Sequence, residues 1–321
     1  MIATMIYKAY LGTKSKFLSA ILWKIRSVIL KFHNPLVTLK YRGFSLKMPL
    51  SHTIFAYQKQ YPHYDMALGK IARFIERKSG VLNIADIGAN IGDTAVFIKA
   101  KNASFLLIEG SRQYANLIEE NLNANYKNIH NMQNAKMQIG GGGSRDNCVK
   151  YIIECTFISD KSNLNYDINL SNGSGNLIQS NSCNLHFQTL DEVFNKHSFT
   201  PNFIKIDTDG FDFKVIRSGL NFIKRHKPSL YFEWDRAFLE TQNENYLSIF
   251  ADLKECGYKD AVIFDNFGSP LCILGLDDER NFSLLASYTT HSRQNIYYYD
   301  ILLLGGELCS GEFIEDFYKG D

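Results

Sequence analysis

Residues 81–93 read Val-Leu-Asn-Ile-Ala-Asp-Ile-Gly-Ala-Asn-Ile-Gly-Asp, an apolar strand followed by a glycine turn and the start of a helix. Gly88 and Gly92 allow the backbone to turn sharply and to approach a ligand closely, because glycine has no Cβ. The turn lacks the full G-x-G-x-x-G pattern and the Lys-Ser/Thr end of a P-loop. A cofactor without phosphates therefore fits it better than a dinucleotide or a nucleoside triphosphate. An ordinary tight connection is the alternative interpretation.

Strands and helices alternate outward from this turn, which predicts an α/β fold with a doubly wound, mostly parallel sheet covered on both faces. We expect seven strands, and the predicted strands are 81–87, 104–108, 149–158, 203–206, 229–234, 261–264 and 296–304. The predicted helices between them are 93–100, 112–125, 213–226 and 246–256.

Two irregular stretches interrupt the alternation. Residues 131–147 contain four consecutive glycines, which favours a flexible insertion. Residues 160–184 are rich in Ser and Asn, and long loops of this kind in compact domains are usually lids or disordered segments. We expect a lid here.

Acidic residues follow several of the predicted strands. Glu109 ends the second strand, 23 residues after Asp86, where doubly wound sheets place an acid that binds ribose hydroxyls. Asp207 and Asp209 end the fourth strand, and Glu233 lies near the end of the fifth. A solvated loop acid at 109 and a helix cap at 209 are the alternatives. Carboxyl ends of parallel strands meet at one edge, so the sequence predicts a shared crevice there.

Several segments together resemble the FkbM family of S-adenosylmethionine-dependent methyltransferases. The more specific signal is Thr189-Leu190-Asp191-Glu192 leading into Lys205-Ile206-Asp207-Thr208-Asp209-Gly210. The resemblance covers roughly residues 50–304 and implies a class I, Rossmann-like methyltransferase domain. The segments that carry it are 86–93, 157–160, 189–192, 203–210, 228–233 and 298–300.

The resemblance implies methyl transfer from S-adenosylmethionine to a hydroxyl of a sugar, a surface glycan or a glycolipid, as in polysaccharide biosynthesis. It places Glu109 at the ribose and Asp160 near the adenine. Asp207 is expected to face the methionine amine or the acceptor. Asp209 stands where family members often have Glu, which shortens the side chain by one methylene. The residues expected at the methionine part of the cofactor are Asp86, Gly88, Asn90 and Gly92.

A neutral hydroxyl is a poor nucleophile, so an O-methyltransferase benefits from a nearby base. The candidates are Asp207, Glu233 and His291, with Asp207 ranked first and His291 last. The acids could also hold a divalent ion such as Mg²⁺, but no dedicated spacing points to one, and metal dependence is left open. Aromatic residues Tyr57, Tyr61 and Tyr64 fit either stacking on a sugar or the cofactor, or packing onto the sheet.

Charge is unevenly distributed along the chain. Residues 1–64 contain ten Lys or Arg and no Asp or Glu, whereas the remainder has 25 basic and 33 acidic residues. Within this arm, residues 15–32 form an amphipathic helix that ends at Asn34-Pro35. The helix fits an anionic membrane surface, the body of the protein or a second subunit, and a homo-oligomer is left open. We expect a basic extension at 1–64, the methyltransferase domain at 65–304 and a tail at 305–321.

Composition limits the alternatives. A net charge of +2 gives no indication of nucleic acid binding, and six scattered cysteines without a C-x-x-C spacing favour a reduced, cytoplasmic protein, peripheral to the membrane at most. We expect neither a signal peptide nor a spanning segment. Two other functions stay open: a nicotinamide-dependent oxidoreductase, and a non-catalytic membrane-surface protein with a degenerate fold.

Overall fold

The computed structural model describes residues 2–64, 66–134, 148–171, 173–180, 185–292 and 295–319. The predicted insertion lies outside these ranges from residue 135 to residue 147. Asp65, the predicted first residue of the catalytic domain, lies outside them too. The division into an extension, a domain and a tail stays a prediction.

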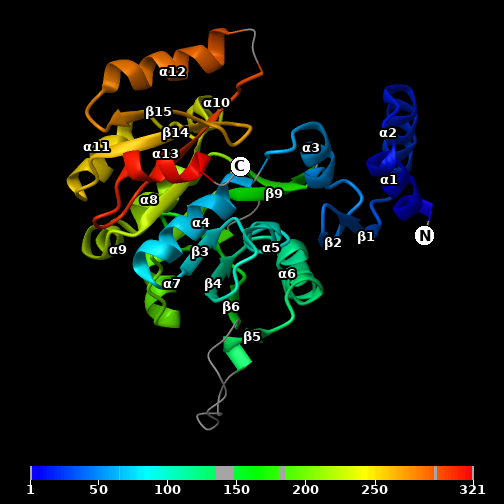
Figure 1. The fold of residues 1–321 in the computed structure, drawn as a ribbon, viewed down its shortest axis with the longest axis horizontal. Coiled ribbons are helices and arrows are strands. Elements are labelled where there is room, and N and C mark those ends of the chain that lie inside the picture. Colours follow the sequence, from blue (N-terminus) through cyan, green and yellow to red (C-terminus); the bar gives the residue numbers. More distant parts are fainter. Residues whose placement is uncertain are drawn as a thin grey trace.

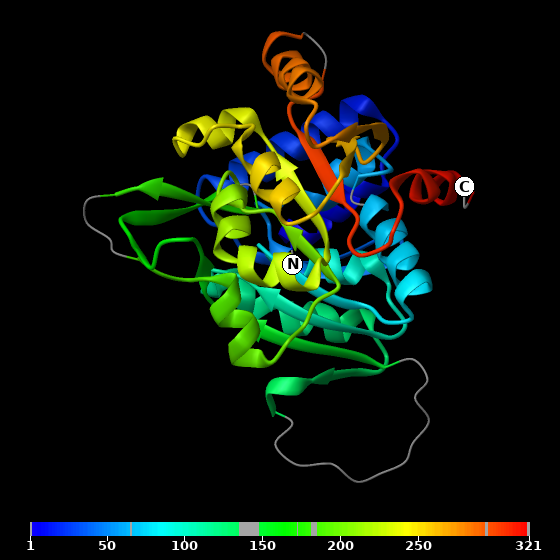
Figure 2. The same ribbon diagram turned by 90° about the vertical axis from the view of Figure 1, so that its left-hand side faces the viewer.

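A mixed, mostly parallel sheet forms the centre of the molecule, with helices on both sides (Figures 1 and 2). In the described part of the chain it has nine strands, in the order β15-β14-β16-β13-β12-β3-β4-β6-β5. The strands from β13 to β5 run parallel, and β14, β15 and β16 add antiparallel pairs. The α/β fold class is confirmed, with two edge strands, β5 and β15, beyond the seven expected. The bounds are β3 Asn83–Ile87, β4 Ala103–Ile108, β5 Ile129–Asn131, β6 Val149–Glu154, β12 Phe203–Ile206, β13 Ser229–Trp234, β14 Asp260–Asp265, β15 Pro270–Gly275 and β16 Tyr299–Leu303.

Two apolar clusters lie on opposite faces of the sheet. Neighbouring strand residues point to opposite faces, so Ile84 belongs to one cluster and Ala85 to the other. The first cluster is covered by α4 Met66–Ser79, α5 Asp93–Ile98, α6 Arg112–Asn125 and α13 Ser310–Tyr318. The second is covered by α7 Leu190–His197, α8 Asp212–Ser218, α9 Leu220–His226, α10 Arg236–Thr241, α11 Ser248–Glu255 and α12 Glu279–His291.

Two predicted elements are divided in the structure. The helix expected at 213–226 consists of α8 and α9, which meet at Gly219. A Cβ at Gly219 would lie 3.0 Å from Cβ of Leu190, so the break allows α7 to pack closely. The strand expected at 149–158 ends at Glu154, and β7 Phe157–Ile158 pairs with β11 Leu185–Gln188 instead of continuing the large sheet.

The segment expected to be a lid contains a hairpin. After β8 Asn163–Leu164, the strands β9 Tyr166–Ser171 and β10 Ser174–Gln179 pair antiparallel, while Asn172 and residues 181–184 are outside the described ranges. Gly173 lies so close to His52 that a Cβ would be 2.8 Å from the imidazole ring. The side-chain amide of Asn90 donates a hydrogen bond to the carbonyl oxygen of Gly173 at 2.6 Å. The hairpin therefore lies directly over the glycine turn, and its role as a lid stays a prediction.

The N-terminal residues form a separate group of elements at one end of the long axis (Figure 1). Helices α1 Ile2–Gly12 and α2 Lys16–Leu30 are followed by α3 Ile54–Gln60, with a hairpin of β1 Leu36–Tyr41 and β2 Phe44–Pro49 between them. The buried Tyr7 donates its hydroxyl hydrogen bond to the carbonyl of His52 at 2.9 Å, which joins α1 to α3. None of the helices in the described ranges has both the length and the apolar character needed to cross a bilayer. The short η1 Met132–Asn134 follows β5.

Candidate active site

The glycine turn between β3 and α5 brings two strand ends together. Gly88 has φ +76°, and a Cβ there would lie 2.0 Å from the carbonyl oxygen of Asp207. Only glycine permits this contact between the ends of β3 and β12. Gly92 has φ +81° and packs on Ile118 of α6, where a Cβ would lie 3.1 Å from Cγ2. The turn therefore sets the position of α5, and the first residues of this helix face the carboxyl ends of the strands.

A cavity of about 470 Å³ lies at the carboxyl ends of β3, β4, β12 and β13, where open α/β sheets bind ligands. Its volume is in the range of small-molecule sites. The sequence-predicted Glu109, Asp207 and Glu233 all line it. Among the described lining residues, six carry carboxyl groups and a single lysine faces them: Asp93, Glu109, Asp207, Asp209, Glu233, Asp300 and Lys205.

Glu109 is held in place by the turns around it. Its Oε2 accepts a hydrogen bond from the backbone N–H of Asn90 at 2.9 Å, and its Oε1 accepts one from Ser111 at 2.7 Å. Burial raises the pKa of Glu109 to about 7, although both hydrogen bonds act in the opposite direction. The carboxyl group is thus oriented and lines the cavity, as a ribose-binding acid requires.

Lys205 lies at the centre of the strand ends and is buried. Its Nζ is 3.2 Å from Oδ1 of Asp86, 3.3 Å from Oδ2 of Asp207 and 3.4 Å from the carbonyl oxygen of Gly88. Burial by itself lowers the pKa of Lys205, but the attraction of Asp86 and Asp207 outweighs burial and leaves the pKa above its usual range. The ammonium group therefore stays charged.

Asp86 lies behind this lysine rather than on the cavity wall. It is fully buried, and within the described residues neither carboxylate oxygen has a hydrogen-bond partner beyond the ion pair with Lys205. Burial raises its pKa, and Lys205 lowers it in part. Asp86 thus acts on the cavity through Lys205.

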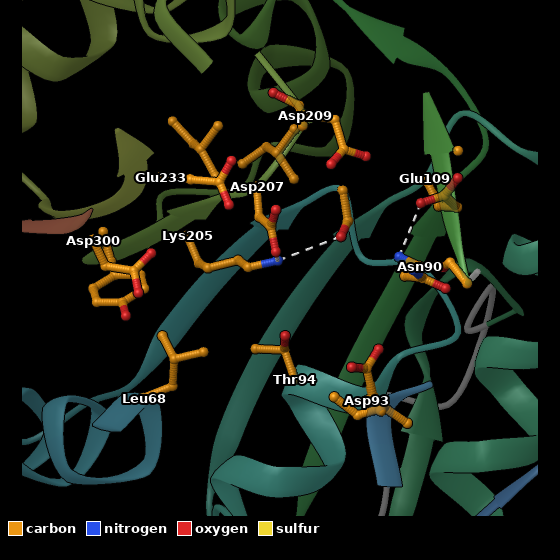
Figure 3. Close-up of a pocket in the computed structure, with 18 of the residues that line it drawn as sticks. Leu68, Asn90, Asp93, Thr94, Glu109, Lys205, Asp207, Asp209, Glu233 and Asp300 are labelled. Carbon is orange, nitrogen blue, oxygen red and sulfur yellow. Dashed lines mark hydrogen bonds and ion pairs between the residues drawn. The ribbon is translucent and has the colours of Figure 1, made fainter. Parts of the chain in front are cut away.

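Figure 3 shows a second acidic group across the cavity from Glu109, with Lys205 between the two. Glu233 of β13 and Asp300 of β16 are paired in register. Burial is the main cause that raises the pKa of Glu233 well above its usual value, and repulsion from Asp207 raises it further. Burial raises the pKa of Asp300 to about 8. One Glu233 oxygen, Oε1, is buried without a hydrogen-bond partner in the described part of the protein, so this wall offers an acceptor for a ligand.

The other predicted positions are more scattered. Asp160 is exposed, accepts a hydrogen bond from the Ser159 hydroxyl at 3.1 Å and is not part of the cavity wall, whereas Phe157 and Ile158 are. Its role at the adenine stays a prediction. His291 is exposed on α12, with Nδ1 3.0 Å from the carbonyl oxygen of Ser287, and it does not line the cavity.

Sequence reasoning did not select Lys205, Asp93 or Asp300 as site residues. Lys205 had a visible signal, because it is the charged member of the otherwise apolar Phe203–Ile206 strand. Asp93 also had one, at the start of the helix that follows the glycine turn. Asp300 follows two tyrosines near the end of the chain, and only the antiparallel pairing of β16 brings it beside Glu233.

The aromatic cluster lines the cavity as well. The rings of Tyr57 and Tyr64 are stacked with centroids 5.5 Å apart, and Tyr61 packs on Phe267 at 4.6 Å. These rings therefore pack within the protein and also face the cavity, and their stacking on a sugar or on the cofactor stays a prediction. The described residues contain no group of three or more His, Cys, Asp or Glu suited to a metal ion.

Residues 86–259, more than half of the chain, match a family model described as the methyltransferase FkbM domain. No curated protein matches the chain. Among solved structures, the methyltransferase FkbM from Methylobacillus flagellatus KT is 17% identical, with a TM-score of 0.31; the match covers 53% of this chain and 37% of that one. The chain thus spans little more than a third of that relative.

Two further structures are similar at lower identity. A SAM-dependent methyltransferase from Agrobacterium tumefaciens is 9% identical, with coverage of 85% of this chain and 71% of that one and a TM-score of 0.40. The plantazolicin methyltransferase BamL, in complex with a triazolic desmethylPZN analog and SAH, is 12% identical, with coverage of 79% and 90% and a TM-score of 0.37. Because these TM-scores are low, the three likenesses say nothing about the activity of this chain.

Proposed function

The chain belongs to the FkbM methyltransferase family, and we propose that it transfers a methyl group from S-adenosylmethionine to a hydroxyl of a sugar, a surface glycan or a glycolipid. One observation carries the proposal: six carboxyl groups share the cavity with a single lysine among the described lining residues. Such a site favours a cationic ligand without phosphates, and a sulfonium cofactor is one. When bound, this cofactor supplies a methyl group that is already activated.

The residues present suit the parts of the cofactor. Glu109, fixed by two backbone hydrogen bonds, has carboxylate oxygens that can accept from ribose hydroxyls. The Gly88 turn and Asn90 border the neighbouring part of the cavity, where the methionine portion would lie. Asn90 leaves its side-chain Oδ1 buried without a donor within the described ranges, which is an available acceptor for an amine. Phe157 and Ile158 offer an apolar wall for the adenine.

Glu233 is the best candidate for the base that receives the hydroxyl proton. Asp207, ranked first from the sequence, is paired with Lys205 at 3.3 Å, whereas Glu233 has no cation partner among the described residues. A carboxylate with a raised pKa accepts a proton more readily, and burial raises the pKa of Glu233. We therefore place Asp207 at the cofactor and Glu233 at the acceptor oxygen.

The lining suits a sugar acceptor. Carboxylates hydrogen-bond to hydroxyls, and the Tyr57–Tyr64 stack in the lining offers aromatic surface for a pyranose ring. A nicotinamide dinucleotide fits less well, because its pyrophosphate is anionic and the cavity already holds an excess of acids.

Transfer of a labelled methyl group to extracted surface glycans tests the function. We expect wild-type protein to label a glycan fraction, and Glu233→Gln to lose most of this labelling, on the order of a hundredfold or more, while it still binds S-adenosylmethionine. Glu279→Gln, on the exposed side of α12, is the matched control and should label normally. Equal labelling by Glu233→Gln and wild type would remove Glu233 from the reaction. A folded wild type that methylates no hydroxyl in these extracts would argue against the acceptor class.

A further inference from the structure

Helix α2 packs on the body through one face, which includes Arg26, and exposes an apolar stripe on another. Arg26 is only 4% exposed, although it carries a full charge. Its Nε donates to the carbonyl of Leu50 at 2.9 Å, its Nη2 donates to the carbonyl of Ser51 at 2.6 Å, and its guanidinium lies over the Trp23 ring at 4.0 Å. These contacts hold one face of α2 against the body, so the opposite face of the helix points outward.

The outward face is an apolar stripe. Phe17 is 78% exposed, Val28 is 50% exposed, and Phe32, directly beyond the helix end, is 81% exposed. At 100° per residue the stripe covers an arc of about 100°, which is the width that a helix normally buries against a partner. Monomeric proteins rarely leave such a contiguous patch in water. The stripe consists of Phe17, Leu18, Ile21, Ile25, Val28 and Phe32.

The charges around the stripe are of one sign. Lys16, Lys24 and Lys31 are exposed on the same helix, and residues 1–64 contain no acidic residue. A symmetric pairing of two α2 faces would bring these lysines against one another, which disfavours a second copy of the chain as the occupant. Anionic lipid headgroups are complementary to them, and acyl chains are complementary to the stripe.

We propose that α2 lies in the surface of an anionic bilayer, with its apolar stripe among the acyl chains and its lysines at the headgroup phosphates. An amphipathic helix with a lysine-rich polar flank binds membranes in this orientation. The exposed apolar stripe and the lysines beside it favour this contact on their own. The proposal therefore does not depend on whether the protein is a methyltransferase.

A second cavity lies beside the active-site cavity, on the side of α2 that faces α1 and α3. It has a volume of about 400 Å³ and lies between α1, α2 and α3. Thr53 and Tyr57 line both cavities. If the proposed function holds, this arrangement favours a lipid-linked glycan as the acceptor, because the helix proposed to contact the membrane lines a cavity that adjoins the active-site cavity.

Vesicle sedimentation of the full chain tests the proposal. We expect the wild type to pellet with vesicles of phosphatidylcholine and phosphatidylglycerol, and much less with phosphatidylcholine alone or in high salt. The variant Phe17→Ser/Ile21→Ser/Val28→Ser should stay in the supernatant. Lys16→Ala/Lys24→Ala/Lys31→Ala should partition on the order of a hundredfold less.

A matched control removes exposed apolar residues elsewhere. Leu284→Ser/Tyr288→Ser alters two exposed positions of α12 that are also one turn apart, and it should pellet like the wild type. Calorimetric binding of S-adenosylmethionine should be the same in all these proteins, which separates the membrane contact from the cavity.

Two outcomes would overturn the proposal. One is sedimentation with anionic vesicles that the serine variant of the stripe does not change. The other is a wild type that ignores vesicles and forms a dimer in analytical ultracentrifugation, which the same serine variant converts to a monomer. In that case a second copy covers the stripe.

Discussion

Lys205 is the residue on which the charge balance of the cavity depends. It lies between Asp86 and Asp207 at 3.2 and 3.3 Å, and it comes from a strand whose other residues are apolar and buried. A buried ion pair contributes little net stability compared with apolar packing, but removing one partner leaves an uncompensated charge. The main effect of Lys205 is therefore at the strand ends, where its ammonium group keeps two carboxylates together.

The variant Lys205→Met should lower the free energy of unfolding by about 3–5 kcal/mol, because Asp86 is then buried without a counter-charge. Urea unfolding measures the loss. Lys205→Met/Asp86→Asn should recover part of it, since the second change removes the orphaned charge. If the single and double variants were equally unstable, Asp86 and Lys205 would not be coupled.

At the scale of elements, local patterns predicted much of the fold. Apolar periodicity gave the strands at 203–206 and 229–234 and the helix at 112–125 at the bounds that the structure shows. The edge strand β15 was missed, because it is defined by its pairing with β14 and shows alternating half-exposed residues. The break at Gly219 was missed too, since its cause is the distant Leu190. The pattern of apolar residues predicts which positions of a segment are buried, but it does not predict which distant segments pack against one another.

The same limit applies to the site. Glu109, Asp207 and Glu233 were predicted because each follows a strand of the parallel sheet. Asp300 reaches the cavity only through the antiparallel return of β16 beside β13. Asp160 follows a short strand that leaves the large sheet, so its position in the sequence did not place it on the cavity wall.

The β3–α5 turn gives a test at this scale. Gly88→Ala should lower the free energy of unfolding by about 2 kcal/mol or more, because it combines a positive φ with a Cβ 2.0 Å from the Asp207 carbonyl. Gly306→Ala is the matched control: its φ is +63° but nothing lies within 4 Å of the added Cβ, so about 1 kcal/mol is expected. Thermal or urea unfolding compares them. Equal losses would show that the two strand ends are not in contact.

At the scale of the whole molecule, charge is divided between two ends. The basic N-terminal elements lie at one end of the long axis, and the acids collect around the cavity of the α/β body (Figure 1). Such a distribution favours the proposed contact of the N-terminal end with an anionic surface and the proposed binding of a cation in the acidic cavity. The second cavity lies among the N-terminal helices, and Thr53 and Tyr57 line both cavities.

The raised pKa values of the carboxyl groups in the cavity predict how stability and ligand binding depend on pH. Burial raises the pKa values of Asp93, Glu109 and Asp209 to about 7 and of Asp300 to about 8. Between about pH 4 and pH 8 the folded protein holds protons that the unfolded chain has released. The free energy of unfolding of the ligand-free protein should therefore decrease as the pH rises from about 4 to about 8. Thermal unfolding across this range measures the trend.

Binding of S-adenosylmethionine should show the opposite trend. A cationic ligand favours the ionised carboxylates, so its affinity should rise from about pH 6 to pH 8 and protons should be released on binding. Calorimetry in two buffers of different ionisation enthalpy counts these protons. Asp300→Asn should release fewer protons than the wild type. An affinity that does not depend on pH would mean that the ligand does not sit among these acids.

Both the proposed reaction and the pH dependence of binding require that the acid-lined cavity at the ends of β3, β4 and β12 binds S-adenosylmethionine. Calorimetric titration of this compound into the folded wild type and into Glu109→Gln measures that binding. We expect one site per chain, and a loss of affinity of about tenfold or more in the variant, because a charge-assisted hydrogen bond to the ribose is weakened. No binding by the wild type, or the same affinity in both proteins, would show that this cavity is not the cofactor site.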